Sequence, residues 1–476
     1  MQRRTKIIAT LGPASDNPEV LSQMVLAGMD VARINFSHGA TEEHMRMVRQ
    51  VRDVSAKLGR DITILGDLAG PKSRIECFSE DRIELKEGAH FSLDYEFDPD
   101  AGTNTVVGIT YAQLSEDLSP GDILLLDDGQ ITLEVTEVEH PRVVSRVLVG
   151  GVLSNKKGIN RLGGGLSAKA LSEKDREDIK LAVEMDVDFL AISFPRDATD
   201  VNEAKSLYQQ AGGQGKIVAK IERAEAIDNI ESIIDASDVV MVARGDLGVE
   251  VGYAELPGLQ KRIIRMTRQK NRVGITATQM MESMLNNPIP TRAEVSDVAN
   301  AVMDGSDAVM LSGETAIGKY PVKAIESMAR ICEAAEKHHL AHTRSRHRID
   351  SVFKHTDEAI AMAAMYTANH LNVRAIIALT ESGKTALWMS RIRSDIPIYA
   401  FTRHERTRRR TNLYRGVFPI SFDITQTRAA KVWKQVSERL LGEGLVAPGD
   451  LIIFTEGEAI GISGGTNSMK LLRVGD

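Results

Sequence analysis

The chain has 476 residues, of which 42% are hydrophobic and 26% charged, and its formal net charge is -7. This length predicts two to four domains, and the composition excludes broad disorder. The negative net charge disfavours a general nucleic-acid-binding protein, and an aromatic content of 4% is too low for base-stacking platforms.

The two cysteines, Cys77 and Cys332, lie far apart and outside any CxxC or Cys/His spacing. This usage predicts neither a disulfide framework nor a zinc site. The basic N-terminal start lacks the apolar stretch of a signal peptide, and no run approaches 18 apolar residues. We therefore expect a cytoplasmic protein with no membrane or nucleic-acid partner.

Short apolar runs alternate with longer amphipathic stretches, a pattern typical of βα units around a parallel sheet. Eight such runs lie near Lys6, Val31, Thr63, Phe189, Lys216, Val239, Gly274 and Ala308. Eight strands is the number that a closed (β/α)8 TIM barrel requires. The sequence therefore predicts an α/β fold built on such a barrel.

Residues 72–165 interrupt the barrel pattern with stretches that alternate apolar and polar residues. A two-residue period predicts half-buried antiparallel strands, so we expect an inserted β-rich lid domain. Gly70 on one side and residues 163–165, all glycine, on the other would suit hinges. The barrel domain is then predicted over 1–71 and 166–340.

Residues 341–476 predict a C-terminal α/β domain that follows a basic connector starting at His338. A helix is expected near Ile360 to His370, followed by the strand RAIIALT, the turn ESGKTA, a second helix and the strand IPIYAFT. LIIFTEG is expected to be the last strand, before a glycine-rich end.

Polar residues gather where the predicted barrel strands end, the rim at which TIM barrels place their catalytic groups. They are Arg33, Asn35, Ser37, His38, Asp67, Lys220, Glu222, Arg244, Gly245, Asp246, Thr276, Thr278, Ser312 and Glu314. Glu222 and Asp246 are oxygen donors suited to Mg2+ or Mn2+. Lys220 is a cation that could stabilise charge on a transferred phosphoryl group. This set indicates metal-assisted chemistry on a small phosphorylated acid.

Long motifs then follow one another in a recognisable order. They are ARINFSHG at Ala32, GDLAGPKSR at Gly66, SNKKGIN at Ser154, SFPR at Ser193, KIER at Lys220, ARGDLGVE at Ala243, TATQMMESM at Thr276, PTRAEVSDVANAV at Pro290 and DGSDAVMLSGETAIGKYP at Asp304. Over nearly its whole length the chain resembles the pyruvate kinases. The resemblance implies phosphoryl transfer from phosphoenolpyruvate to ADP, giving pyruvate and ATP, in the last step of glycolysis. It also implies a homotetramer with a C-terminal effector domain.

The resemblance, together with side-chain chemistry, suggests further roles at the rim. The guanidinium fork of Arg33 suits a substrate phosphate, and the turn at Gly245 and Asp246 can hold a carboxylate. Thr278 is expected to contact substrate and to position a proton relay. Ser312 and Glu314 are expected in the same catalytic network.

The nucleotide phosphates are expected near a second set of polar residues, which the resemblance supplies. These are Asn35, Ser37, His38 and Arg74, with Lys156 or Lys157 reaching them from the lid. A lysine pair on a turn is also typical of a solvated surface, so the choice between the two lysines stays open.

One motif departs from the pattern of many family members, which read DTKGPEIR where this chain has DLAGPKSR. Members with the glutamate generally use K+ near the positions of Asn35, Ser37, Asp67 and Leu68. Here Lys72 replaces that glutamate, and a fixed ammonium can substitute for a mobile cation at short range. We therefore expect turnover that is independent of K+.

The turn formed by Thr380, Ser382, Gly383, Lys384 and Thr385 could cradle a phosphate of a phosphorylated metabolite effector. It is not a Walker A loop, because Ala378 stands where the first glycine is required. The arginine-rich run RHERTRRR from Arg403 is expected to be a solvated or subunit-facing surface rather than a direct effector site.

Three other functions deserve weighing. A lyase of citrate-like acids is disfavoured by the inserted lid and the SNKKGIN and SGKT segments. A catalytically inactive regulator is disfavoured because Lys220, Glu222, Asp246, Arg33 and Thr278 are all present. A nucleic-acid or scaffold protein is disfavoured by charge and aromatic content. Fold alone would not separate these functions.

Overall fold

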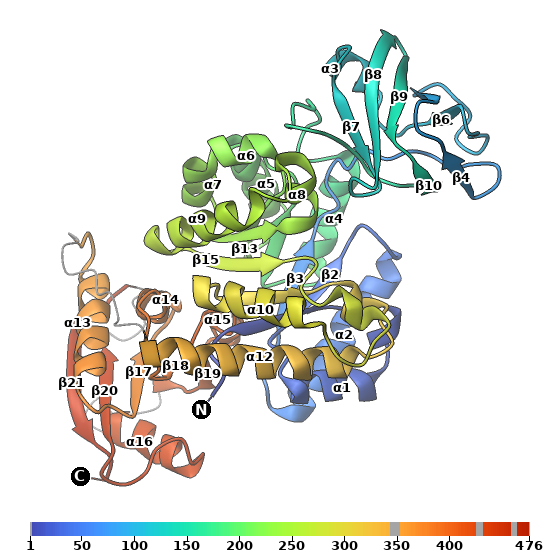
Figure 1. Ribbon diagram of the computed structural model, residues 1–476. Coiled ribbons are helices and arrows are strands. Elements are labelled where there is room, and N and C mark those ends of the chain that lie inside the picture. Colours follow the sequence, from blue (N-terminus) through green and yellow to red (C-terminus); the bar gives the residue numbers. More distant parts are fainter. Residues whose placement is uncertain (1, 343–352, 425–431, 458–463, 476) are drawn as a thin grey trace. The chain divides into compact units, whose positions relative to one another are not determined.

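The computed structural model describes residues 2–342, 353–424, 432–457 and 464–475. Eight parallel strands close into a barrel in the order β1-β16-β15-β14-β13-β12-β3-β2. They are β1 (Lys6–Thr10), β2 (Val31–Asn35), β3 (Thr63–Asp67), β12 (Phe189–Ile192), β13 (Lys216–Ile221), β14 (Val239–Ala243), β15 (Val273–Ala277) and β16 (Ala308–Leu311). The barrel and all eight predicted strands are confirmed (Figure 1).

The barrel strands are buried along almost their whole length, which explains their sequence pattern. Every residue of β1, β3, β14 and β15 is buried. Strands of a parallel barrel are covered on both faces, by the barrel interior and by the surrounding helices. They therefore appear in the sequence as continuous apolar runs.

Helices follow the barrel strands in the order expected of a (β/α)8 fold. They are α1 (Pro18–Ala27), α2 (Thr41–Leu58), α4 (Glu173–Glu184), α5 (Ala198–Gln210), α6 (Ala224–Asp228), α7 (Ile230–Ala236), α8 (Arg244–Val251), α9 (Leu256–Gln269), α10 (Arg292–Asp304), α11 (Gly313–Ala316) and α12 (Pro321–His342), with short 3-10 turns η1 (Pro13–Ser15) and η2 (Glu282–Leu285). Local signals fix their ends. Thr291 and Glu294 form a reciprocal capping box at the start of α10.

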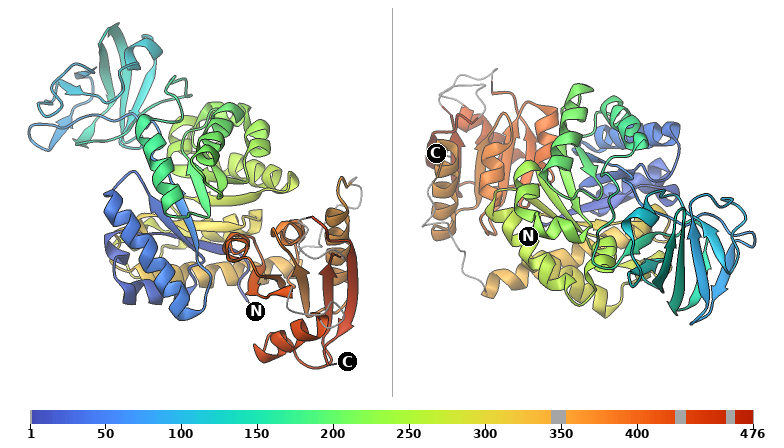
Figure 2. Two further views of the ribbon diagram at one scale, coloured as in Figure 1. Left: turned by 180° about the vertical axis from the view of Figure 1, so that it is seen from behind. Right: turned by 90° about the horizontal axis from the view of Figure 1, so that it is seen from above.

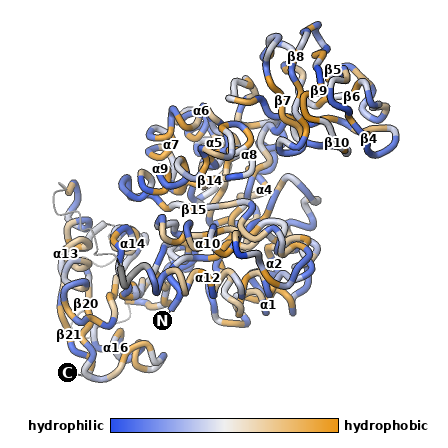
Figure 3. Tube along the Cα trace, viewed as in Figure 1, coloured by the Kyte–Doolittle hydropathy of each residue, from blue (hydrophilic) through white to orange (hydrophobic). Residues whose placement is uncertain are grey.

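The insertion between β3 and α4 consists mainly of strands (Figure 2). It contains β4 (Arg82–Leu85), β5 (His90–Asp94), β6 (Val106–Gly108), α3 (Leu114–Asp117), β7 (Ile123–Leu126), β8 (Ile131–Glu139), β9 (Arg142–Val149), β10 (Gly151–Ser154) and β11 (Ile159–Arg161). Alternate residues of β9 are buried, as the two-residue period predicts. Hydrophobic stretches are visible along β7 and β9 (Figure 3). Gly70 has a φ of 70° and residues 163–165 have φ of 84°, 77° and 92°, all of which favour glycine.

The C-terminal domain is a five-stranded sheet in the order β19-β18-β17-β20-β21. Its elements are α13 (Thr356–His370), β17 (Ala375–Leu379), α14 (Lys384–Ser390), β18 (Ile398–Thr402), α15 (Glu405–Thr411), β19 (Val417–Ser421), α16 (Val432–Gly442), β20 (Leu451–Glu456) and β21 (Ser468–Arg473). The prediction that LIIFTEG is the last strand is wrong. β21 follows it and pairs antiparallel with β20, as an edge strand whose residues are mostly half-exposed or exposed.

Contacts divide the chain into two compact units. One comprises Met1–Gly66, Met185–Leu190 and Ile264–Asp476, and the other Asp67–Glu184 and Ala191–Ile263. This division leaves the predicted three-domain boundaries untested. The expected connector begins at His338, inside α12, which extends to His342. The remainder of the connector falls within residues 343–352, which lie outside the described residues.

Within the first unit, buried ion pairs join the C-terminal domain to the barrel. Arg391 donates from two nitrogens to Asp307, and these side chains are 0% and 2% exposed. Arg409 Nε lies 2.7 Å from Asp188 Oδ1, on the turn before β12. Removing one partner of such a buried pair generally costs about 3 to 5 kcal/mol, so both pairs hold the C-terminal domain in place.

The expectation of a solvated or subunit-facing surface is wrong for part of the RHERTRRR run. Arg408 Nε lies 2.9 Å from Asp61 Oδ2, and Arg409 also contacts Asp186 at 2.7 Å. The Arg409 side chain is only 7% exposed. Because these guanidinium groups face acidic residues of the same unit, they serve domain attachment.

None of the helices in the described part of the chain has the length and apolar content that crossing a bilayer requires.

Candidate active site

The end of β13 holds a lysine between three oxygen atoms. Lys220 Nζ lies 2.6 Å from Ser193 Oγ, 3.0 Å from Glu222 Oε1 and 3.2 Å from Asp67 Oδ1. Its side chain is 11% exposed, and that of Asp67 is fully buried. The ammonium group is therefore fixed in one position, with two carboxylates compensating its charge.

Glu222 is buried and faces two further carboxylates of the same unit. Its Oε2 accepts the backbone N–H of Phe194 at 2.9 Å. Phe194 adopts a φ of 56°, a strained conformation for an aromatic residue that is common at functional sites. Burial raises the pKa of Glu222, and the charges of Asp246 and Asp67 add to this, whereas Lys220 lowers it. Negative charge is thus crowded around Glu222.

Asp246 lies in the first turn of α8, directly after Gly245. Its Oδ1 is 2.5 Å from Lys72 Nζ, so the lysine of the DLAGPKSR motif contacts an expected metal ligand. Both side chains are partly exposed, 24% for the lysine and 18% for the aspartate.

A divalent cation fits the oxygen donors of this site. Glu222 and Asp246 influence one another's charge, and a positive ion between carboxylates would relieve their repulsion. Within the described ranges, no group of three or more His, Cys, Asp or Glu side chains has an arrangement that could hold a metal ion. Two protein carboxylates are nevertheless sufficient for Mg2+, which keeps several positions for substrate oxygens and water.

Ser193 was not singled out as a site residue, and the structure shows that it positions Lys220. Its hydroxyl donates to Leu68 O at 2.8 Å and accepts from Lys220 Nζ. Leu68 N in turn donates to Ala191 O at 3.0 Å. Asp67 and Leu68, expected near a monovalent cation, therefore lie beside Lys220. The SFPR motif was the signal that could have identified Ser193.

In the other unit, Arg33 is a buried residue at the end of β2. Its Nη1 donates to Thr10 Oγ1 at 3.0 Å, and Thr10 Oγ1 donates to Leu311 O at 2.9 Å. Thr10 was also missed by sequence reasoning, although it ends the first predicted strand. The hydrogen bond to Thr10, the last residue of β1, therefore orients the guanidinium group of Arg33.

Thr278 and Gln279 follow β15 with φ of 66° and 51°. Two consecutive non-glycine residues in the left-handed region are strained, and such strain persists only where the surroundings enforce it. Glu314 provides one such constraint, because it accepts N–H groups from Met281 at 3.0 Å and Ser312 at 2.7 Å. Glu314 thus ties the loop after Thr278 to the end of β16. Burial raises the pKa of Glu314.

The residues expected at the nucleotide lie in both units. Asn35 accepts the N–H of Ser37 at 3.2 Å, and His38 O contacts His44 Nε2 at 2.8 Å. Ser37 and His38 are exposed at the end of β2.

In the lid, Arg74 Nη1 donates to Lys156 O at 3.0 Å, so these two residues lie together. Lys156 pairs with Glu76, and Lys157 pairs with Asp127 at 2.7 Å. Both lysines therefore have acidic partners within the lid.

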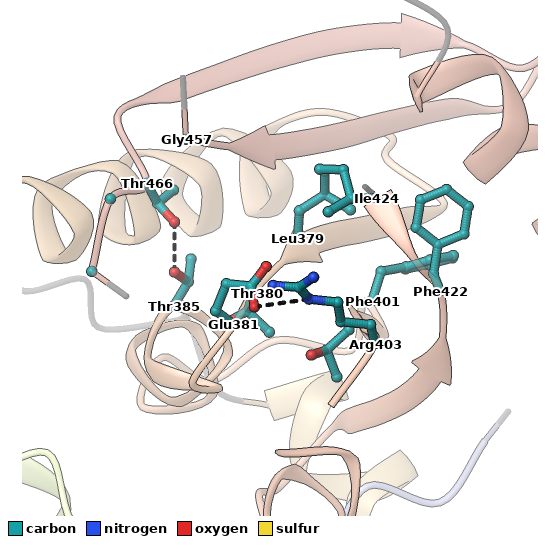
Figure 4. A pocket seen from close by; sticks show the side chains of 13 residues that line it. Leu379, Thr380, Glu381, Thr385, Phe401, Arg403, Phe422, Ile424, Gly457 and Thr466 are labelled. Carbon is teal, nitrogen blue, oxygen red and sulfur yellow. Dashed lines mark hydrogen bonds and ion pairs between the residues drawn. The ribbon is translucent and has the colours of Figure 1, made fainter. Parts of the chain in front are cut away.

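A pocket of about 50 Å3 lies at the carboxyl ends of β17 and β18 (Figure 4). Thr380 and Thr385, two residues of the turn at which an effector site is predicted, line it, and Thr385 Oγ1 contacts Thr466 Oγ1 at 2.8 Å. Arg403 also lines it and pairs with Glu381 at 3.5 Å.

The other residues expected at the effector site, Ser382, Gly383 and Lys384, are not among those that line this pocket. Lys384 Nζ instead lies 3.4 Å from Asp357 Oδ2 and over the Trp388 ring. Of the five residues predicted at the effector site, Thr380 and Thr385 therefore line the pocket.

Glu250, near the end of α8, joins the barrel to the base of the lid. Its Oε2 accepts the N–H of Ala224 at 2.9 Å, and its carbonyl accepts the N–H of Gly163 at 3.0 Å. Burial raises the pKa of Glu250 to about 7, with a smaller contribution from Glu225. No sequence motif pointed to this carboxyl group.

The raised pKa of Glu250 predicts a loss of stability as pH rises. The folded protein holds this proton more tightly than the unfolded chain, whose pKa is near 4.5. Stability therefore falls between about pH 4.5 and 7, by up to about 3 kcal/mol, and the full penalty remains at higher pH. Glu250→Gln should remove this part of the pH dependence of denaturant unfolding. Glu255→Gln, at an exposed neighbour, is the matched control; identical pH profiles for wild type and Glu250→Gln would contradict the prediction.

Comparison with known proteins identifies two domains of one protein family in the chain. The pyruvate kinase barrel domain matches residues 2–325, and the pyruvate kinase alpha/beta domain matches residues 358–472. Pyruvate kinase II of Salmonella typhimurium is 54% identical, with 99% of each chain covered. The pyruvate kinase of Haemophilus influenzae is 51% identical over 96% of each chain, and that of Bacillus licheniformis is 43% identical over 100% of this chain and 81% of its own. The chain belongs to the pyruvate kinase family.

Proposed function

We propose that the end of β13 is the centre at which this family member transfers the phosphoryl group of phosphoenolpyruvate to ADP, giving pyruvate and ATP. The observation that carries the proposal is the fixed position of Lys220, held by Ser193, Asp67 and Glu222. A preorganised cation at a buried site stabilises developing negative charge without reorganising when the reaction occurs.

Lys220 would stabilise charge at two places. The transferred phosphoryl group spreads its charge over three equatorial oxygens, and the departing enolate carries charge on its oxygen. Because Ser193 and the two carboxylates fix the ammonium group, substrate need not order it. Lys220 is thus the residue with the most direct catalytic role.

Glu222 and Asp246 would hold Mg2+ or Mn2+. When bound, the cation would neutralise phosphate charge and orient the reacting oxygens. The first turn of α8, with Gly245 and Asp246, offers backbone N–H groups at the positive end of a helix, where the substrate carboxylate would be held.

Arg33 and Thr278 would complete the substrate site. Arg33 can bind the substrate phosphate with two parallel N–H donors. Thr278 would position the proton that reaches the methylene carbon of the enolate, and Glu314, with Ser312, would keep the strained loop in place. Their placement after parallel strands of one barrel supports this assignment.

Asn35, Ser37, His38 and Arg74 are proposed to approach the nucleotide phosphates. Lys156 would join them only by leaving Glu76. Surface ion pairs of this kind are worth about 0 to 1 kcal/mol, so such an exchange costs little.

Replacing Lys220 tests the catalytic proposal. Lys220→Met should lower kcat by about 10³- to 10⁵-fold, the range found when other phosphoryl-transfer enzymes lose a charge-stabilising cation. Steady-state pyruvate formation measures this loss. Lys216→Met is the control, because Lys216 starts the same strand but is 44% exposed and pairs with Asp238. Retention of most turnover in Lys220→Met would overturn the assignment.

We further propose that turnover does not require K+. Lys72 lies 2.5 Å from Asp246 and so already supplies a positive charge beside an expected metal ligand. At such a separation a fixed ammonium acts on neighbouring carboxylates as a bound monovalent cation would.

The pocket beside β17 and β18 is proposed to bind a phosphorylated effector. Thr380, Thr385 and Arg403 offer hydroxyl and guanidinium donors for a phosphate. Glu381 engages Arg403, and an anionic ligand would have to displace this contact.

Activation by AMP and by sugar phosphates tests the effector proposal. Arg403→Gln should abolish activation by whichever compound activates the wild type, with little change in basal kcat, because Arg403 lies in the C-terminal domain. Ser382→Ala is the control, since Ser382 does not line the pocket. Unchanged activation of Arg403→Gln, or a wild type that none of these compounds activates, would contradict the proposal.

A homotetramer in the cytoplasm is proposed from family membership. The two cysteines are unpaired with one another, in keeping with a reducing compartment. A molar mass in solution equal to that of one chain, 52.1 kDa, would exclude the oligomer.

A further inference from the structure

The loop between β2 and α2 is exposed, yet it carries residues of the proposed nucleotide site. It runs from the end of β2 to the start of α2 (Figure 1). All four residues from 37 to 40 are exposed, and they include Ser37 and His38. A loop with so little burial opens easily unless side chains from the protein interior hold it in one conformation.

The imidazole of His44 is a buried group that holds this loop. His44 lies near the start of α2 and is 3% exposed, and its Nε2 is 2.8 Å from His38 O. A carbonyl oxygen can only accept a hydrogen bond, so Nε2 carries the proton. Nδ1 is buried and has no hydrogen-bond partner among the described residues. In the described part of the chain, the ring therefore makes its hydrogen bond through Nε2, to the loop.

Gly39 allows the loop to approach His44 closely. It adopts a φ of 89°, which favours glycine, and a Cβ at this position would lie 3.1 Å from His44 Nε2. Glu43 Oε2 lies on the same side of the loop and accepts the backbone N–H of Ala40 at 3.1 Å. The start of α2 thus contacts the loop backbone on both sides of Gly39.

The imidazole is itself fixed by the barrel. The ring of Phe36 is fully buried and meets the His44 ring edge to face, with the centroids 5.3 Å apart and an interplanar angle of 61°. Phe36 in turn packs against Gly66 of β3, where a Cβ would come within 3.2 Å of Phe36 Cε2. His44 is therefore a donor in a fixed position rather than a mobile side chain.

A buried histidine bound to a carbonyl can also serve stability alone, but the contacts of this loop favour a role at the site. Asn35 holds its first half, because its Oδ1 accepts the N–H of Ser37 at 3.2 Å and its carbonyl accepts that of His38 at 3.4 Å. His44 holds its second half through His38 O. A loop fixed at both ends presents Ser37 and His38 without paying an ordering cost when a ligand binds.

We propose that His44 is a positioning residue of the nucleotide site, whose Nε2–H orders residues 37–40 before ADP binds. The inference rests on the proposed approach of Ser37 and His38 to the nucleotide phosphates. His44 itself is buried behind the loop and contacts neither ADP nor phosphoenolpyruvate. Loss of its Nε2 donor should therefore weaken nucleotide binding and leave the chemical step unchanged.

Substitutions of His44 that differ only in the reach of their donor test the proposal by steady-state pyruvate formation. His44→Asn and His44→Leu should raise the KM for ADP about three- to tenfold, the loss expected for one neutral hydrogen bond. The KM for phosphoenolpyruvate and kcat should stay at the wild-type values. His44→Gln should retain the wild-type KM for ADP, because its amide nitrogen reaches the place of Nε2, whereas that of asparagine reaches only the place of Nδ1.

Val48→Ala is the matched control for a general loosening of α2. Val48 lies one turn beyond His44 on the same helix and is 6% exposed, so its truncation weakens packing without removing a donor to the loop. Its KM for ADP should equal that of the wild type. Calorimetric titration of the full chain with MgADP measures the Kd without turnover and should rank the variants in the same order. Circular dichroism identifies a variant that does not fold, and if His44→Leu fails, the comparison of His44→Asn with His44→Gln carries the test.

An unchanged KM for ADP in His44→Asn would overturn the positioning role, and so would equal increases in His44→Asn and His44→Gln or in His44→Asn and Val48→Ala. The double variant Ser37→Ala/His38→Ala separates this failure from failure of the nucleotide assignment. If the double variant raises the KM for ADP and His44→Asn does not, only the role of His44 is wrong. If neither raises it, the loop does not bind the nucleotide and both proposals are wrong.

Discussion

Carboxylates buried at the ends of barrel strands have to be matched by positive charge, and this requirement organises the catalytic region. Asp67 and Glu222 share Lys220, and Asp246 contacts Lys72. The two lysines are thus the fixed part of the compensation, and a divalent cation would supply the rest. Removing any one charge changes the surroundings of all the others, so this cluster is expected to respond to mutation as a unit.

Charge compensation also joins the C-terminal domain to the barrel half of its unit. Arg391 with Asp307, and Arg409 with Asp188, are pairs in which both side chains are almost fully buried. Such pairs specify one geometry, because a displaced partner leaves a charge without compensation in a poorly solvated place.

Sequence patterns predicted the elements that are buried on both faces. The barrel strands are covered on both faces and appear as apolar runs, and the rim position of Lys220 and Glu222 follows from strand direction alone. β21 was missed because an edge strand buries little of its surface. Thr10 and Ser193 were missed because their role is to position another residue, which depends on contacts between strands distant in sequence. The attachment through Arg408 and Arg409 could not be predicted, since a run of arginines looks the same whether its partners are water or buried aspartates.

We propose that the fixed ammonium group of Lys72 replaces a mobile monovalent cation at this carboxylate cluster. The initial rate of pyruvate formation from phosphoenolpyruvate and ADP with Mg2+ tests this proposal, measured in tetramethylammonium buffer and again with K+ at the same ionic strength. We expect equal rates for the wild type, and a K+ requirement for Lys72→Glu, which lacks the ammonium beside Asp246. A wild type that turns over only when K+ is present would contradict it.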